Sequence, residues 1–556
     1  RRPLQGFRAP PKKGANGLFW AVAGNPQCAA FAWQAAFAWQ IGFDEQACEA
    51  AGPGYVSSVF GILLPVFICF IPRLNRQPPS PQPQGIPCRK APGLIMNIYH
   101  HDRFAEPTRP APRIETEHRR IRTPIPAPQT RDVLEAHRRL FPRVNCYQPP
   151  IVWDRAAGYQ VFDAADNCWI DFSSTAVMTN AGHAHPVIRA ALETQAREGM
   201  LAQFSFPSEQ RVRLAERILN VCPPGMEKVY FWTTGSEAIE SALRLGRAWG
   251  HQQDPRKTHV LTHRGDFHGI TLGATQLSGE TASKDWLVSP DRHIHHLPFP
   301  GPPDHPDLTD PVALLDENLT QLERRGVSGK QIAGVFLETM QGWGALSYPA
   351  TYLERMREWA DEHQVLLVFD EIQTGFGRTG RWFGHQHYGV RPDLLCVGKG
   401  LSSSLPLAAV IGPACVLDVL SPGAVTTTHA AHPVSCAAAL ANLDVLEQEN
   451  LIDEADRKAQ LVEQDLARLQ QRFPNQIARV EGRGLLWALH LYNPSTGAAD
   501  ERLAADWTWA AVRHGVMVFH TMRPTLKICP PLTIPDSALR EGIEALATAL
   551  QSLLPQ

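Results

Sequence analysis

Between residues 228 and 412 the chain alternates short runs of continuous apolar residues with longer amphipathic segments. Uninterrupted apolar runs are typical of strands that are buried on both faces of a parallel sheet. The expected strands are 228–234, 332–340, 365–372, 394–401 and 407–412, and the expected helices are 235–250, 312–325 and 351–364. This alternation predicts an α/β fold built around a mostly parallel sheet.

Two of the expected strands end abruptly in ionisable residues. Asp370 and Glu371 close the first of them, and Lys399 closes the second. In open parallel sheets, ligands bind beyond the carboxyl ends of the strands. We therefore expect Asp370 and Lys399 to face a shared crevice.

The turn TTGSEA at 233–238 joins an expected strand to an expected helix. Thr234, Gly235 and Ser236 stand at the helix start, where free N–H groups and the helix dipole suit a phosphate. A phosphate site, a lysine and a buried carboxylate together favour pyridoxal 5'-phosphate (PLP), with Lys399 as the Schiff base and Asp370 on the pyridine nitrogen. Each signal alone has a plainer explanation: an N-cap, a solvated lysine, and an Asp-Glu pair in a surface turn.

Composition narrows the remaining classes of function. The formal net charge is −2, and acidic and basic residues are mixed along the chain. The sequence therefore shows no basic region of the kind that binds nucleic acid. The 11 cysteines show no regular spacing, which favours a reducing compartment. His293, His295 and His296 have no carboxylate set at ligand spacing, so we expect a solvated loop or a strand edge and no metal site.

The first 95 residues differ in composition from the rest of the chain. They are rich in Pro, Cys and Trp and contain no methionine, so we expect a poorly structured extension. The sequence leaves open whether this extension is native or whether Met96 is the first residue. The apolar run 54–72 barely reaches membrane-spanning length and contains Gly61 and Pro65, so we favour a cytoplasmic protein over an anchored one.

From about residue 115 to 550 the chain resembles the class III PLP-dependent aminotransferases of fold type I, which include ornithine- and 4-aminobutyrate-like enzymes. The matching motifs are NAGHAHP (180–186), TTGSEA (233–238), FHGITLGA (267–274), LETMQGWGALSYP (337–349), FDEIQTGFGRTG (369–380), VGKG (397–400), THAAHPVSCAAAL (428–440), VEGRGLLWAL (480–489) and KICPPL (527–532). The implied regions are the extension 1–95, a linker 96–114, a large PLP-binding domain 186–440, and a small α+β domain built from 115–185 and 441–556. The resemblance also implies a homodimer with shared active sites.

The resemblance assigns a role to each matching position. Lys399 would carry the cofactor and move the proton at the donor carbon, and Asp370 would hold the pyridine nitrogen. His268 would support Asp370, and Glu338 would lie near the site, with a purely structural role left open for both. The other expected contacts are Gln373 to the phenolic oxygen, Phe267 on the ring, Thr234, Gly235 and Ser236 to the phosphate, and Thr428 to the phosphate of the neighbouring subunit.

Departures from the family pattern concern the substrate. In many 4-aminobutyrate-like members a Glu stands at Trp343 and an Arg at Lys527, and the pair switches between an α-carboxylate and an ω-amine. Tryptophan cannot neutralise a cation by ion pairing, although it can stack on one. Lysine lacks the planar guanidinium with which arginine binds a carboxylate through two hydrogen bonds. Arg523 is a candidate substitute anchor, with an ordinary surface arginine as the plainer reading. Two further departures are Ile270 for Arg and His432 for Asn.

We expect a ping-pong aminotransferase that passes an amino group from an amino acid or ω-amine to a 2-oxo acid, such as 2-oxoglutarate or pyruvate, through pyridoxamine phosphate. Trp343 and Tyr159 as apolar walls favour an ω-amino acid or a primary amine. Two alternatives stay open: an aminomutase, phospho-lyase or racemase on the same fold, and a catalytically silent, membrane-tethered homologue. The intact Lys399, Asp370 and Gln373 speak against lost catalysis.

Overall fold

The structure, a computed structural model, describes residues 102–555 apart from 147, 280–283, 494–495, 497 and 522. The expected extension 1–95, with its apolar run 54–72, lies outside the described residues. Across the part of the chain that is described, no helix is both long and apolar enough to cross a membrane.

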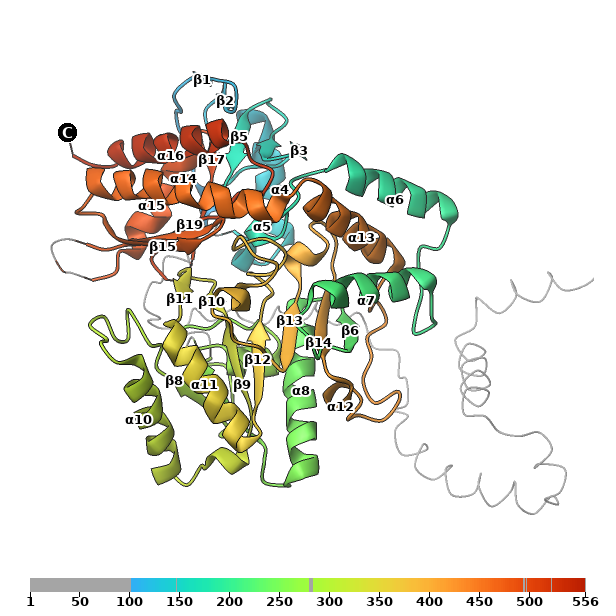
Figure 1. Cartoon of the computed structure of the whole chain (residues 1–556). Helices are drawn as coiled ribbons and strands as arrows, with labels where there is room; N and C mark the ends of the chain where they lie inside the picture. Colours follow the sequence, from blue (N-terminus) through green and yellow to red (C-terminus); the bar gives the residue numbers. More distant parts are fainter. Residues whose placement is uncertain are drawn as a thin grey trace, which may run out of the picture. The chain divides into compact units, whose positions relative to one another are not determined.

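A seven-stranded sheet forms the centre of the fold (Figure 1). Its strands lie in the order β6 (Lys228–Trp232), β14 (Ala408–Gly412), β13 (Leu394–Val397), β12 (Leu366–Asp370), β9 (Ile332–Glu338), β7 (His259–His263) and β8 (Ile294–Leu297). The pairs from β13 to β8 are all parallel, and β14 is antiparallel to both of its neighbours. The mostly parallel sheet predicted from the sequence is therefore confirmed.

Both faces of this sheet are buried. Leu366 and Val368 of β12 join a core that includes the inner side of helix α8 (Gly235–Gln253). The alternating residues Leu367 and Phe369 join the opposite core, together with side chains of α10 (Pro311–Arg324) and α11 (Ala350–His363). Because neighbouring residues of a strand point to opposite faces, burial on both sides produces the continuous apolar runs seen in the sequence.

The run expected as one strand over 332–340 divides into two elements. After β9 ends at Glu338, β10 (Met340–Gln341) pairs with β11 (Leu346–Ser347) in an antiparallel hairpin. The hairpin follows the carboxyl end of β9, and its turn contains Trp343. The histidine-rich stretch expected as a loop or strand edge forms β8, the edge strand of the central sheet.

Segments from the two ends of the described chain pair with each other. Strand β17 (Val516–Met517) runs parallel to β5 (Cys168–Asp171), whose sheet also contains β1 (Ile114–Glu115), β2 (Arg120–Ile121), β3 (Arg155–Ala157) and β4 (Gln160–Phe162). A separate antiparallel sheet contains, in spatial order, β15 (Ile477–Arg483), β16 (Leu486–Leu491), β19 (Thr525–Ile528) and β18 (Phe519–His520). A small domain built from both ends of the chain requires such pairing. The boundaries predicted for that domain, 115–185 and 441–556, stay a prediction.

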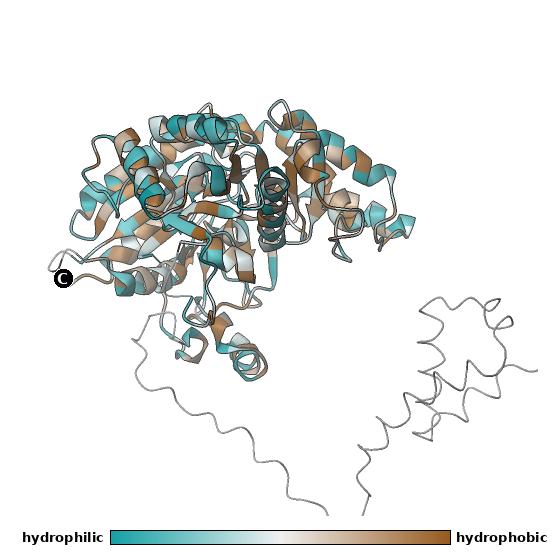
Figure 2. Ribbon diagram, turned by 90° about the horizontal axis from the view of Figure 1, so that it is seen from below, coloured by the Kyte–Doolittle hydropathy of each residue, from teal (hydrophilic) through white to brown (hydrophobic). Residues whose placement is uncertain are grey.

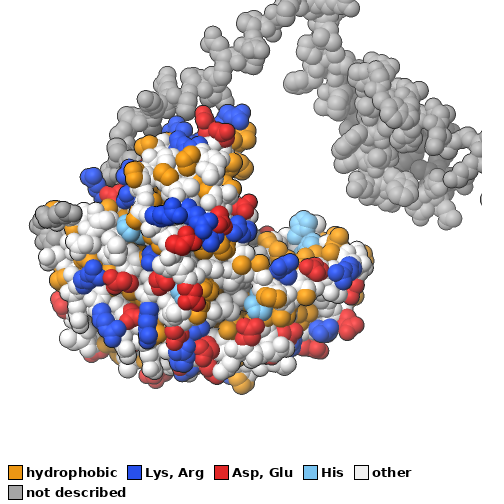
Figure 3. All heavy atoms as spheres, turned by 90° about the horizontal axis from the view of Figure 1, so that it is seen from above, with side chains coloured by type: hydrophobic (Ala, Val, Ile, Leu, Met, Phe, Trp, Pro, Cys, Tyr) orange, Lys and Arg blue, Asp and Glu red, His pale blue; other side chains and the backbone are white. Residues whose placement is uncertain are grey.

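The remaining helices lie around these sheets (Figures 1 and 2). They are α4 (Arg131–Leu140), α5 (Ser174–Val177), α6 (Pro186–Glu198), α7 (Glu209–Val221), α9 (Leu272–Leu277), α12 (Ala414–Leu417), α13 (Pro433–Gln448), α14 (Leu451–Arg472), α15 (Glu501–Arg513) and α16 (Asp536–Gln551). In Figure 2 many of them carry hydrophobic and hydrophilic residues on different sides. On the face drawn in Figure 3, basic and acidic side chains are interspersed.

Candidate active site

Asp370 and Lys399 lie past the ends of adjacent parallel strands. Asp370 closes β12 in register with Cys396 of β13, and Lys399 begins the short helix that follows β13. Lys399 has a left-handed backbone with φ 40°, which costs a non-glycine residue on the order of 1 kcal/mol and is common at functional sites. Burial lowers the pKa of Lys399 against the opposing pull of the Asp370 and Glu338 carboxylates, which favours a neutral amine.

Asp370 is held at both carboxylate oxygens. Its Oδ2 lies 2.8 Å from Nδ1 of His268, and its Oδ1 accepts a hydrogen bond of 3.0 Å from the Ile372 N–H. Both Asp370 and His268 are buried. The contact that the sequence predicted between these two residues is therefore present.

Glu338 closes the neighbouring strand β9 and organises the loops around the site. Its Oε2 accepts a hydrogen bond of 2.8 Å from the Phe267 N–H, and its Oε1 accepts one of 3.0 Å from the Gly342 N–H. Gln373 approaches the same Oε1, with its Nε2 at 3.4 Å. Burial, reinforced by the nearby carboxylates of Asp266 and Asp370, raises the pKa of Glu338 well above its usual range.

The first turn of α8 lies directly against the turn that follows β12. A Cβ atom on Gly235 would lie 2.8 Å from Cδ1 of Ile372, so glycine permits this close approach. Thr234 caps the helix, and its hydroxyl accepts a hydrogen bond of 3.3 Å from the Glu237 N–H. The Ser236 hydroxyl accepts one of 3.1 Å from the Ile270 N–H. The start of this long helix therefore has the N–H groups, hydroxyls and dipole that suit an anion.

Phe267 and Trp343 form an aromatic pair beside these groups. Their ring centroids are 5.1 Å apart, and the rings meet edge to face at 73°. The Trp343 carbonyl accepts hydrogen bonds from the Thr521 and Thr525 hydroxyls at 3.1 and 2.8 Å. The backbone at Trp343 is thus fixed by β19 and the turn before it.

Lys527 is also held by this hairpin turn. It is a buried residue of β19, and its Nζ donates a hydrogen bond to the Gly342 carbonyl. Burial lowers the pKa of Lys527 to about 8. The Lys527 ammonium is therefore bound to a backbone carbonyl beside Trp343.

Other predicted positions are placed differently. The hydroxyl of Tyr159, in the turn between β3 and β4, lies 2.8 Å from Nδ1 of His118. This contact gives no support for Tyr159 as an apolar wall of the active site. Thr428 is exposed in a turn before α13. Arg523 is half-buried instead of lying on the open surface, because Gly265 has no side chain and leaves room for the guanidinium.

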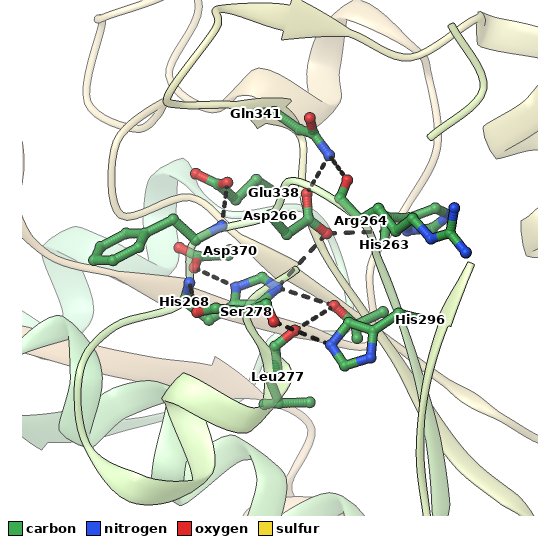
Figure 4. A network of polar contacts seen from close by, with 12 residues as sticks. His263, Arg264, Asp266, His268, Leu277, Ser278, His296, Glu338, Gln341 and Asp370 are labelled. Atoms are coloured by element: carbon green, nitrogen blue, oxygen red, sulfur yellow. Dashed lines mark hydrogen bonds and ion pairs between the residues drawn. The ribbon is translucent and has the colours of Figure 1, made fainter. Parts of the chain in front are cut away.

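Sequence reasoning missed Asp266. This buried carboxylate accepts hydrogen bonds from Nε2 of Gln341 at 3.0 Å and from the Tyr348 hydroxyl at 3.4 Å, and its Oδ2 lies 3.7 Å from Nε2 of His268 (Figure 4). The available signal was the one that identified Asp370, namely a carboxylate shortly after an apolar strand. Among the described residues, no group of three or more His, Cys, Asp or Glu side chains could hold a metal ion.

The residues at this edge of the sheet fit PLP. The anion site at α8, the carboxylate of Asp370 and the amine of Lys399 match the phosphate, the protonated ring nitrogen and the aldehyde of that cofactor. Phe267 supplies a half-buried aromatic ring in the same region.

Comparison with known proteins agrees with this reading. The sequence profile of the family described as aminotransferase class-III matches residues 143–550. A leucine/methionine racemase of Thermococcus litoralis is 30% identical over 430 residues, which cover 75% of this chain and 95% of the racemase. The 4-aminobutyrate aminotransferase of Escherichia coli is 31% identical over 428 residues, which cover 75% of this chain and 97% of that enzyme.

A solved structure shows the same fold. The amine transaminase from an uncultivated Pseudomonas species, in a PLP-bound form, has a TM-score of 0.67 and 28% identity, over 72% of this chain and 94% of the transaminase. The resemblance read from the motifs, and the fold type it implied, are therefore confirmed. The chain belongs to the class III aminotransferases, and it is a PLP-dependent enzyme of fold type I.

Proposed function

We propose that this enzyme moves an amino group from a primary amine or an ω-amino acid to a 2-oxo acid such as 2-oxoglutarate or pyruvate. The observation that carries the proposal is the position of Lys399 and Asp370 at one edge of the parallel sheet. Bound PLP supplies an electron sink for the negative charge that develops at the donor carbon. The residues around it bind the cofactor, set its protonation and move the donor proton.

Lys399 is the proposed acid and base. Its pKa is lowered by burial, so a neutral amine can take the proton from the donor carbon and return it. Asp370 keeps a proton on the ring nitrogen, and His268 supports Asp370 through the bond to Oδ2. Thr234, Gly235 and Ser236 bind the phosphate at the start of α8. Phe267 covers the ring, and Gln373 reaches its phenolic oxygen.

The donor class follows from Trp343 and Lys527. The Lys527 ammonium is buried against the Gly342 carbonyl, which makes it a poor partner for a donor carboxylate. Trp343 places an aromatic surface beside Phe267, at the position where the resemblance to 4-aminobutyrate-like enzymes implies a glutamate. Both features favour a donor whose amine-bearing carbon carries no carboxylate.

A labelling experiment tests this function. The purified protein is supplied with PLP, a 2-oxo acid and a panel of donors containing ¹⁵N in the amino group, and the amino acid product is analysed by mass spectrometry. We expect ¹⁵N in the product, loss of transfer in Lys399→Ala, and normal transfer in the control Lys330→Ala, which removes an exposed lysine. Absence of label with every donor would refute the proposal.

Racemisation is a second candidate, because the leucine/methionine racemase of Thermococcus litoralis is 30% identical to this chain. A racemase would invert an amino acid without any 2-oxo acid and would exchange its α-hydrogen with solvent. Incubating single enantiomers in D₂O without an oxo acid separates the two reactions. Inversion with deuterium uptake would move the assignment to a racemase.

We also propose a homodimer with shared active sites. Several large apolar side chains are exposed in the single chain, including Ile270 beside the start of α8 at 80% and Phe206 in the loop before α7 at 71%. A second copy that covers them would bring its own Thr428 to the phosphate of the neighbouring site. Light scattering should give twice the chain mass, and Phe206→Asp should shift it towards the monomer.

A cytoplasmic location is the accompanying proposal. The described cysteines Cys146, Cys168, Cys222, Cys396, Cys415, Cys436 and Cys529 are all free thiols, as is usual in a reducing compartment. Fractionation of expressing cells should place the protein in the cytosolic fraction. Recovery with the membranes would favour the tethered alternative.

A further inference from the structure

Asp266 is a fully buried carboxylate that the proposed function does not use. It lies in the loop after β7, and its Oδ1 accepts the hydrogen bonds from Gln341 and Tyr348. Its Oδ2 is buried and has no hydrogen-bond donor among the described residues. A buried carboxylate oxygen in this state needs a nearby positive charge to offset its desolvation.

His268 supplies that charge. Its ring lies between two carboxylates, with Nδ1 at 2.8 Å from Asp370 and Nε2 at 3.7 Å from Asp266 (Figure 4). Burial alone would lower the pKa of His268, but the two carboxylates outweigh burial and raise it to about 10. The placement of the ring between two carboxylates therefore favours the imidazolium, with a proton on each nitrogen.

The two other buried histidines near Asp266 do not supply this charge. His263 lies 4.0 Å from Asp266 Oδ2, but burial lowers its pKa to about 4, and its Nε2 lies 2.9 Å from the Tyr352 hydroxyl. Burial also lowers the pKa of His296 to about 4. Other ionisable groups nearby are Glu338 from β9, Tyr348 after β11, Lys399 after β13, Arg523, whose guanidinium lies against Gly265, and Lys284, whose Nζ lies 3.3 Å from Nε2 of His296.

We propose that Asp266 is a positioning residue that keeps His268 doubly protonated and its Nδ1–H directed at Asp370. The inference rests on the proposed function, because Asp370 is the group that would meet the ring nitrogen of PLP. A hydrogen bond from a charged donor to a carboxylate is roughly twice as strong as a neutral one. Asp266 thereby holds Asp370 fixed in orientation without touching the cofactor.

Asp266→Asn tests the role of the charge while it preserves the shape. The asparagine oxygen can still accept the bonds from Gln341 and Tyr348, but the counter-charge to His268 is lost. The readout is the pKa of His268, followed by ¹⁵N NMR of histidine-labelled full-length protein with and without PLP, with His268→Gln to assign the signal. We expect the His268 pKa to fall by about 1 to 3 in Asp266→Asn.

Two controls separate charge from structure. Tyr348→Phe removes a hydrogen bond to Asp266 but leaves its charge, and Asp163→Asn removes a buried carboxylate elsewhere in the fold, so neither should move the His268 signal. An unchanged His268 pKa in Asp266→Asn would overturn the proposal.

The wild-type protein provides a second test that needs no variant. At pH 8 both ring nitrogens of His268 should give imidazolium shifts, and a neutral ring would also overturn the proposal. The readout without PLP does not depend on catalysis, so failure of the aminotransferase proposal would be recognised separately by the absence of ¹⁵N transfer.

Discussion

Glu338 and Asp370 are paired in register across the parallel strands β9 and β12, so two buried carboxylates end at the same edge of the central sheet. Their surroundings separate them chemically. Nδ1 of His268 lies against Asp370, whereas burial and the neighbouring carboxylates raise the pKa of Glu338. One carboxylate thus lies against a histidine ring, and the other binds the backbone of the loops around the site.

Glu338→Gln should weaken those loops. Both Glu338 oxygens accept from backbone N–H groups, of Phe267 and Gly342, and an amide can offer an oxygen to only one of them. The lost bond should lower the free energy of unfolding by about 1–3 kcal/mol. Urea unfolding measures this loss, and dialysis should show faster release of PLP. The control Glu317→Gln changes an exposed residue of α10, and equal stability of both variants would contradict the expected role.

Arg378→Met should destabilise the whole enzyme. The fully buried guanidinium donates hydrogen bonds to the Leu485 and Pro530 carbonyls at 3.0 and 2.5 Å and to Asn180 Oδ1 at 2.7 Å. These acceptors come from segments far apart in the chain, and each would be left buried without a donor. We expect a loss on the order of 3 kcal/mol or more, measured by urea unfolding. Arg381→Met, at a more exposed arginine nearby, should change the midpoint little.

The sequence predicted the meeting of Asp370 and Lys399 because the carboxyl ends of parallel strands converge at one edge. It could not reveal that β14 runs against its neighbours, since a strand buried on both faces reads the same in either direction. The contacts of Asp266 with Gln341 and Tyr348 could not be predicted, because they join a loop residue to residues more than 70 positions away. The contact between Lys527 and Gly342 joins residues 185 positions apart, and only the tertiary fold brings them together.

His259 should make the protein less stable in mild acid. Burial lowers its pKa to about 4, and Nδ1 lies 2.9 Å from Nε2 of His295, whose pKa is lowered for the same reason. The unfolded chain, with a histidine pKa of about 6.5, binds more protons between these values, so stability falls as the pH drops from about 6.5 to about 4.

Melting temperatures from pH 7.5 to 5 measure this effect. His259→Gln should flatten the decrease of the melting temperature with falling pH. His251→Gln, at an exposed histidine, is the control and should retain the wild-type slope. If both variants follow the wild-type curve, then His259 is not a source of the acid sensitivity.

Trp343→Ala should widen the range of amine donors. The indole packs edge to face with Phe267, which we place on the cofactor ring, so truncation should open space beside the donor carbon. The backbone should keep its position because the Thr521 and Thr525 hydroxyls hold the carbonyl of residue 343, whatever its side chain. We expect kcat/KM for a bulky aryl amine to rise by about tenfold relative to a small amine.

The ratio between two donors distinguishes a change of shape from a general loss of activity. A disturbed active site would lower kcat/KM for both amines together, whereas an enlarged pocket changes their ratio. Trp286→Ala truncates an exposed tryptophan and should leave that ratio unchanged. An unaltered ratio in Trp343→Ala would mean that the indole does not border the donor, and the preference would then have to be sought in the residues around Lys527 and Arg523.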